Sequence, residues 1–319
     1  MKILFTADVH IKLGQKNVPV DWARNRFRLF CEQFAEMQKS ADVVIVGGDI
    51  FDRLPTMDEV ELYFDFVESF NKPTMIYPGN HEMLKKDTTF LTNLKKATHR
   101  LNPLVRVIDD YNEDVSNIDI IPYNKLKDFE KHGHAFGGRI LCTHVRGEIL
   151  PHVKPEVDLD IFSRWDIVLA GDLHSYENSQ LNILYPGSPY TTSFHRSSVD
   201  TGAILLDADT LGHVWLKFQL PQLLKRTITA EEAASASATD FDHTIYEVEG
   251  DMQELGDLAD SDLIATKVLK RDTDSALLLD PEMSLDAEVK EYLTYILELP
   301  EPTVNRVLQE MQNHAEKLT

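Results

Sequence analysis

KILFTADVH (residues 2–10) and DVVIVGGDIFD (residues 42–52) each place polar side chains directly after a short apolar run. Runs of this kind, rich in Val and Ile and bounded by Gly, Pro or Asp, predict buried strands. Helical patterns lie between the runs, notably at 21–39 and 57–70. The further runs are TMIYPG (74–79), VRVID (105–109), IDIIPY (118–123), RILCT (139–143) and DIVLAG (166–171), and segments 183–187 and 202–219 read as later strands, with a turn at 210–212. This alternation predicts an α/β domain.

Side chains that can bind metals follow five of the predicted strands. Because ligands bind beyond the carboxyl ends of strands in α/β sheets, we expect them to meet at one rim. The residues are Asp8 and His10 after the first run, Asp49 after the second, Asn80 and His81 after TMIYPG, His144 after RILCT, and Asp172 and His174 after DIVLAG. One such residue would mean little, because Gly-Asp and Gly-Asn pairs are common in turns. Five strand ends that each carry such residues, in this order, predict a metal centre.

The ligand types indicate which metals fit. Carboxylate, imidazole and amide groups without thiolate suit Mn²⁺, Fe²⁺ or Zn²⁺, and the carboxylates favour Mn²⁺. Even without His81, seven ligand-type residues exceed the need of one ion, so we expect two ions, about 3.5–4 Å apart, with Asp49 between them. A water held there would become the hydroxide nucleophile, because each cation lowers its pKa.

The motifs DVH, GGDIFD, GNHE, THV and GDLH together resemble the calcineurin-like metallophosphoesterase superfamily. Within it, GGDIFD, YPGNHE and YPGSPYTTSF (185–194) are similar to the SbcD family, the bacterial and phage relatives of the meiotic-recombination nuclease. The resemblance covers residues 1–220 well. It implies two facing β-sheets flanked by helices. It also implies a Mn²⁺-dependent DNA exonuclease or endonuclease, the nuclease subunit of an SbcCD-like recombination and repair complex, with Mg²⁺ as the other candidate metal.

The resemblance also implies residue roles. Asp8, His10, Asp49 and His174 would hold one metal, and Asp49, Asn80, His144 and position 172 the other. His81 would be the catalytic histidine, which stabilises the scissile phosphate and protonates the leaving 3′ oxygen; imidazole suits that role because its ordinary pKa lies near operating pH.

One position departs from the family pattern. The usual Gly-His-X-His is here Gly-Asp172-Leu173-His174. Aspartate is still a hard ligand, but it is shorter than histidine and adds negative charge. We therefore expect a shifted second metal, one bound through water, or one more selective for manganese, with loss of activity as the remaining alternative.

Charge is placed unevenly along the 319 residues. The formal net charge is -21, and residues 227–319 hold 22 acidic against 6 basic side chains. An acidic protein binds DNA poorly alone, because affinity comes largely from Lys and Arg. Cations do occur on the ligand-bearing loops, which suits a phosphate backbone, although any phosphate ester would attract them and several could simply be solvated. The candidate DNA contacts are Lys12, Lys16, Arg53, Lys85, Lys86, Arg146 and Arg196.

We expect three parts. Residues 1–226 form the nuclease domain, and the low-complexity stretch 230–240 marks a boundary. By resemblance, 227–283 is a small α/β capping domain. Residues 284–319 read as two helices, with LPEP (299–302) between them. A pair this short must dock on something, either its own domain or, by resemblance, the coiled coil of an SbcC-type ATPase.

The helix predicted at 57–70 is unusually apolar, and the helix at 88–101 offers Phe90, Leu91, Leu94 and Leu101 nearby. By resemblance they form a homodimer contact, and the alternative is a helix deeply buried in a monomer. No segment is long and apolar enough for a membrane helix. The two cysteines, Cys31 and Cys142, offer no disulfide framework, which favours a reducing cytoplasmic setting, the bacterial host cytosol for a phage protein.

Two other functions share these motifs. A small-molecule or cyclic-nucleotide phosphodiesterase would need every metal ligand but not the terminal helices. A non-catalytic scaffold on the same fold would tolerate Asp172, although the presence of His81 argues against it.

Overall fold

A six-stranded sheet lies at the centre of the computed structural model, which describes residues 1–85, 88–115, 117–233, 235–237, 241–259, 261–269, 284–297 and 299–315. Its order is β13-β12-β1-β2-β3-β6. β1, β2, β3 and β6 run parallel, and β12 and β13 continue antiparallel at one edge. The bounds are β1 Lys2–Thr6, β2 Val43–Gly47, β3 Thr74–Tyr77, β6 Val105–Val107, β12 Gly202–Asp207 and β13 His213–Lys217.

A five-stranded sheet, ordered β11-β10-β9-β8-β7, packs against the first. β8, β9, β10 and β11 are parallel, and β7 pairs antiparallel with β8. The bounds are β7 Asn112–Val115, β8 Ile118–Ile121, β9 Ile140–His144, β10 Ile167–Gly171 and β11 Ile183–Leu184.

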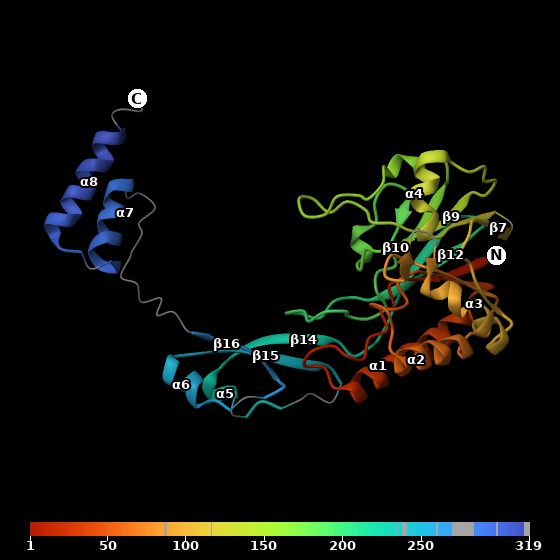
Figure 1. Cartoon of the computed structure of the whole chain (residues 1–319), viewed down its shortest axis with the longest axis horizontal. Helices are drawn as coiled ribbons and strands as arrows, with labels where there is room; N and C mark the ends of the chain where they lie inside the picture. The colour runs from red at the N-terminus through yellow and green to blue at the C-terminus, as the bar shows by residue number, and fades with distance from the viewer. Residues whose placement is uncertain are drawn as a thin grey trace. The chain divides into compact units, whose positions relative to one another are not determined.

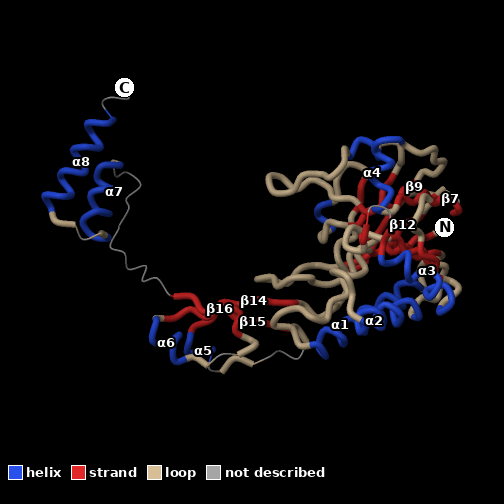
Figure 2. The backbone as a smooth tube through the Cα atoms, in the orientation of Figure 1, coloured by secondary structure: helices blue, strands red, loops and turns tan. Residues whose placement is uncertain are grey.

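Both faces of the central strands are buried, which explains their continuous apolar sequence. In β1, Ile3 and Phe5 point toward the second sheet and share a core with Ile120 and Cys142. Leu4 points the other way, into a core formed with the helices α1 (Val20–Gln38) and α2 (Met57–Glu68). On the outer face of the second sheet, α4 (Tyr123–His132) contributes to a third core. Figures 1 and 2 show the strands between α1 and α2 on one side and α4 on the other.

The predicted fold class is confirmed. All seven apolar runs form strands at the expected places, and the predicted helices at 21–39 and 57–70 correspond to α1 and α2. The turn at Thr210–Gly212 separates β12 from β13 as predicted. The sequence interpretation did not identify β7, α4 or the short pair β4 (Met83–Lys85) and β5 (Thr88–Thr89).

The apolar surface of α2 is largely covered within one chain. Val60, Leu62, Tyr63, Phe66 and Val67 are buried, and Phe64 packs against the same core. A capping box between Thr56 and Glu59 begins the helix. Helix α3 (Phe90–Leu101) packs beside it. The homodimer contact through residues 57–101 stays a prediction.

The remaining elements lie toward the carboxyl end. A three-stranded sheet has the order β14-β15-β16, with bounds Leu223–Thr229, His243–Gly250 and Ile264–Leu269. The chain forms two compact units, residues 1–248 with 258–267, and residues 249–257 with 268–319. The short helices are η1 Leu159–Phe162, η2 Tyr176–Asn178, α5 Ala230–Ala233 and α6 Met252–Asp257, and the terminal ones are α7 Leu285–Glu291, η3 Tyr292–Ile296 and α8 Glu301–Ala315. Among the described helices, none could span a membrane.

Candidate metal centre

The predicted ligands lie where strands of both sheets end. Asp8 follows β1 and Asp49 follows β2, and the two loops are joined where the His10 amide donates to the Asp49 carbonyl at 2.9 Å. Asn80 and His81 follow β3, the next strand of the first sheet. From the second sheet, His144 is the last residue of β9, and Asp172 and His174 follow its neighbour β10. The rim is therefore assembled from two sheets.

The backbone at this rim is strained. Asp8, His10, Asp49 and Asp172 have φ angles of 57°, 46°, 50° and 103°. Residues other than glycine rarely adopt positive φ angles, because each such residue costs of order 1–3 kcal/mol. Such residues cluster at functional sites, where the surrounding structure compensates the cost. The strain turns four polar side chains inward at the ends of buried strands.

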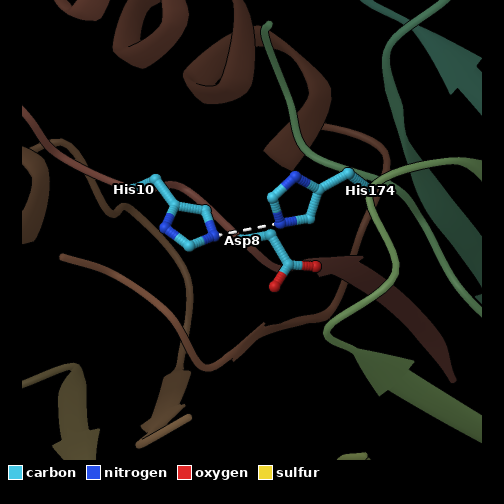
Figure 3. A group of neighbouring side chains, drawn as sticks. All are labelled: Asp8, His10 and His174. Carbon is cyan, nitrogen blue, oxygen red and sulfur yellow. Dashed lines mark hydrogen bonds between the residues drawn. The ribbon is translucent and has the colours of Figure 1, made fainter. Parts of the chain in front are cut away.

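One group of possible ligands consists of Asp8, His10 and His174, whose ligand atoms lie within 4.8 Å of one another. Figure 3 shows Asp8 beside the two imidazole rings, whose Nε2 atoms are 3.1 Å apart. Burial lowers the pKa of His10 to about 3 and also lowers the pKa of His174. The rings are thus kept neutral, the form that binds a metal. The His174 Nδ1 atom lies 3.2 Å from the Thr192 hydroxyl, which orients the ring.

A second group surrounds His144. Its Nδ1–H donates to the Gly47 carbonyl at 2.9 Å, so Nε2 faces the site. The Asn80 amide can turn either its oxygen or its nitrogen toward His144 Nε2. Whichever amide atom faces His144 lies 2.9 Å from Nε2 and 3.0 and 3.2 Å from the two Asp49 carboxylate oxygens. With the amide oxygen inward, these groups attract positive charge. Burial alone would lower the pKa of His144. The negative charge of Asp49, together with those of Asp8 and Asp172, outweighs burial and raises the pKa of His144.

Asp49 lies between the two groups. Its Oδ2 atom is 3.7 Å from His10 Nε2 and 3.4 Å from His144 Nε2. Despite burial, the neighbouring His144 lowers the pKa of Asp49, so this carboxylate is ionised. Carboxylate oxygens, imidazole nitrogens and an amide converge here, and this donor set fits divalent cations.

His81 lies beside these groups and is about one-third exposed. Its backbone N–H donates to Asp49 Oδ1 at 3.0 Å, and its Nδ1–H donates to the Asp52 carbonyl. Nε2 is then left facing the site, 3.8 Å from Asp49 Oδ2. This position allows His81 to exchange a proton with a bound group; His10, Asp49 and His81 also form a possible ligand set.

Asp172 is placed differently from the other predicted ligands. Its backbone N–H donates to both Asp8 carboxylate oxygens at 3.1 Å. Its carboxylate accepts two hydrogen bonds from Arg146, at 3.1 and 3.3 Å. Oδ1 remains 3.8 Å from His144 Nε2. Among the described residues, the compact ligand groups leave Asp172 out.

Comparison with known proteins agrees with this geometry. Residues 1–198 match the calcineurin-like phosphoesterase family. The chain is a member of the calcineurin-like phosphoesterases. It is 38% identical over 318 residues to "Probable exonuclease subunit 1" of Escherichia phage T5, covering 97% of each chain. Solved structures that match the chain include an archaeal phosphodiesterase (14% identity, 68% of this chain and 100% of that one, TM-score 0.38) and a Thermus thermophilus protein (12%, 68% and 98%, TM-score 0.42).

Glu82 supports the ligand loops of this phosphoesterase, and the sequence interpretation did not single it out. Its buried carboxylate accepts from the backbone N–H of Asp49, Phe51 and Gly79 at 3.0, 2.9 and 2.8 Å. Burial, reinforced by Asp49, raises the pKa of Glu82 to about 7. The available signal was its place in GNHE, directly after two predicted site residues.

The predicted rim cations of the phosphoesterase mostly have acidic partners. Lys12 pairs with Asp52 at 2.8 Å, Arg53 with Glu59 at 3.1 Å and Arg196 with Glu247 at 2.6 Å. Arg146 pairs with Asp172 as described above. Lys16 and Lys85 are exposed, and Lys86 lies outside the described residues.

A cavity of about 770 Å³ extends from His174, one of the possible metal ligands. Hydroxyl groups and aromatic rings dominate its wall. The lining includes Ser188, Tyr190, Thr191, Thr192 and Trp215. The phosphoesterase centre therefore opens into a space large enough for part of a substrate.

Proposed function

We propose that this phosphoesterase is a Mn²⁺-dependent DNA nuclease that uses two cations and serves as the nuclease subunit of an SbcCD-like recombination and repair complex. The observation that carries the proposal is the convergence of carboxylate, imidazole and amide groups from five strand ends beside His81. The phage T5 relative is named as an exonuclease subunit, which supports both a nucleic-acid substrate and assembly with another subunit.

Each metal position uses one of the two groups. Asp8, His10 and His174 would hold one cation. Asn80, His144 and Asp172 would hold the other. Asp49 reaches both groups and would be shared between them. Bound cations would supply a nucleophile generated from water and would neutralise charge on the phosphate. The oxygen-rich donor set favours Mn²⁺ over Zn²⁺, with Mg²⁺ as a second candidate.

His81 would move the proton. The Asp52 carbonyl accepts from Nδ1–H, so Nε2 would carry the second proton of the imidazolium and donate it to the leaving 3′ oxygen. Glu82 would keep the loops of Asp49 and Asn80 at a fixed separation. The cavity beside His174 would receive the end of the DNA strand.

Attraction for DNA would come from several sources. Lys12, Lys16, Arg53, Lys85, Lys86, Arg146 and Arg196 are the proposed DNA contacts. Most of the described ones are neutralised by carboxylates, so we propose that a partner ATPase supplies much of the missing positive surface. The proposed ATPase site is the helical pair within 284–319, where Leu293 and Val304 are buried but Tyr292 and Leu297 are about half exposed. By the same proposal, residues 227–283 cap the DNA path and helices in 57–101 form a homodimer.

The paired rim cations also favour a second candidate, a small-molecule or cyclic-nucleotide phosphodiesterase. Such an enzyme would need fewer unpaired cations, because its substrate makes few phosphate contacts. It would use the same metal ligands and His81.

Substitution of His81 tests the proposal. We expect wild-type protein with Mn²⁺ to degrade linear duplex DNA, and His81→Ala to lose about 10²–10⁴-fold in rate, the usual contribution of a positioned acid or base. His132→Ala is the matched control, because His132 is exposed on α4 and pairs only locally with Asp128. It should retain wild-type activity.

Other outcomes identify the alternatives. Intact DNA together with His81-dependent cleavage of bis-nitrophenyl phosphate would show a small-ester enzyme. No cleavage of either substrate by wild-type protein would show a non-catalytic scaffold. Equal DNA cleavage by wild type and His81→Ala would remove His81 from the proposed chemistry.

A further inference from the structure

Arg146 and Asp172 form an ion pair at the edge of the second ligand group. Arg146 donates from Nε to Asp172 Oδ2 at 3.1 Å and from Nη2 to Oδ1 at 3.3 Å. The Asp172 side chain is 7% exposed, whereas that of Arg146 is 45% exposed. The pair thus joins a carboxylate inside the centre to a guanidinium that solvent can reach.

The same carboxylate has two competing uses. Asp172 Oδ1, which accepts from Arg146 Nη2, is also the oxygen that lies 3.8 Å from His144 Nε2. A guanidinium holds both oxygens of a carboxylate in a fork, and it binds a phosphate in the same way. Arg146 therefore competes with a cation for Asp172, and a phosphate competes with Asp172 for Arg146.

The backbone of Arg146 is held independently of its guanidinium. Its N–H donates to Glu156 Oε1 at 3.0 Å, and Glu156 Oε2 accepts from the Tyr123 hydroxyl at 2.9 Å. The side chain can then exchange partners while the base of the loop stays in place. A long flexible side chain on a fixed backbone is suited to such an exchange.

We propose that Arg146 couples phosphodiester binding to occupancy of the second cation position. Without substrate, Arg146 holds Asp172 and weakens this position. When a phosphodiester binds, its oxygens take the guanidinium and free Asp172 for the cation. This inference rests on the proposed two-cation function and makes Arg146 a positioning residue for it.

Thermodynamic linkage makes the coupling reciprocal, so substrate tightens the second cation and the cation tightens substrate by the same factor. We expect a factor of about tenfold, within the roughly 5–150-fold range of such couplings. Because Arg146 holds it, Asp172 is not a permanent ligand of the second cation position; it becomes available when the substrate is present.

Mn²⁺ binding measured by calorimetry and by electron paramagnetic resonance tests the proposal without reading activity. In wild type, a phosphorothioate-linked duplex should tighten the second Mn²⁺ about tenfold. Arg146→Gln should bind the second Mn²⁺ tightly without the duplex and gain little from it. Arg139→Gln is the matched control, because Arg139 also pairs with a carboxylate, Asp166, and should behave as wild type.

A double-mutant cycle gives the second measurement. In an Asp172→Asn background, Arg146→Gln should leave the second affinity nearly unchanged, because the group for which Arg146 competes is absent. Equal second affinities in wild type and Arg146→Gln, or equal tightening by duplex in both, would overturn the inference. Wild type that binds a single Mn²⁺ even with duplex would instead refute the two-cation function itself.

Discussion

Replacing Glu82 by glutamine separates support of the metal centre from support of the fold. Glu82 Oε2 accepts from the backbone N–H of Asp49 and Gly79, and Oε1 accepts from that of Phe51. Glutamine can offer its one oxygen to the first pair, but its NH₂ group then faces the Phe51 N–H. One buried donor loses its acceptor, and two donors oppose each other.

The magnitude follows from these contacts. Leaving a buried donor unsatisfied costs about 1–3 kcal/mol. Since the pKa of Glu82 is already raised to about 7, loss of its charge adds little, and the hydrogen-bond mismatch dominates. We expect Glu82→Gln to lose about 2 kcal/mol of unfolding free energy, which corresponds to about 4–8 °C in Tm for a domain of this size. Mn²⁺ affinity should fall about 10–100-fold, as when groups that orient metal ligands are replaced.

Thermal unfolding in EDTA and Mn²⁺ titration measure the two effects. Asp119→Asn is the matched control, because Asp119 is also a buried carboxylate and accepts from Trp165 Nε1 at 2.7 Å and from the Gly138 N–H. It should lower Tm but leave Mn²⁺ affinity unchanged. Wild-type Mn²⁺ affinity in Glu82→Gln, or an equal loss of affinity in Asp119→Asn, would refute the reasoning.

Three further results are expected. Saturating Mn²⁺ at about 100 times its Kd should stabilise the wild type by about 2.7 kcal/mol, read as a higher Tm than in EDTA; no shift would contradict the metal centre. Gly79→Ala should weaken Mn²⁺ binding in calorimetry, because the new Cβ would lie 2.1 Å from Asp49 Oδ1, whereas Gly137→Ala, with open space around it, should bind as wild type. Deleting residues 284–319 should leave Mn²⁺-dependent nuclease activity but abolish co-purification with the proposed partner ATPase; a retained complex would contradict that role for the helices.

The fold could be predicted from the sequence because burial on both faces makes the central strands continuous apolar runs. Each run ends at a polar residue whose position along the chain marks the carboxyl end of a strand. The same rule located Asp8, Asp49 and His144. Strand β7 and helix α4 were not identified, because NEDV (112–115) and YNKLKDFEKH (123–132) carry few apolar residues.

Partners of the charged side chains could not be predicted in the same way. Arg146 was interpreted as a DNA contact and Asp172 as a ligand, yet they bind each other from loops 26 residues apart. Glu82 resembles a surface acid in sequence, but it accepts three backbone hydrogen bonds inside the protein. Each contact joins loops that follow neighbouring strands of one sheet, β9 with β10 and β2 with β3, and the pattern of a single strand does not specify such a pairing.

If DNA is the substrate, as proposed, the ion pairs at the rim would let this acidic chain act on a polyanion without binding it indiscriminately. Lys12, Arg53, Arg146 and Arg196 each have a carboxylate partner, so a phosphate must displace that partner before it gains the cation. Affinity for duplex alone is then low, since fewer free cations are available to replace counterions. A chain with a net charge of -21 would therefore act best where a partner already holds the DNA, and the exchange at Arg146 would admit the second cation when a phosphodiester is bound.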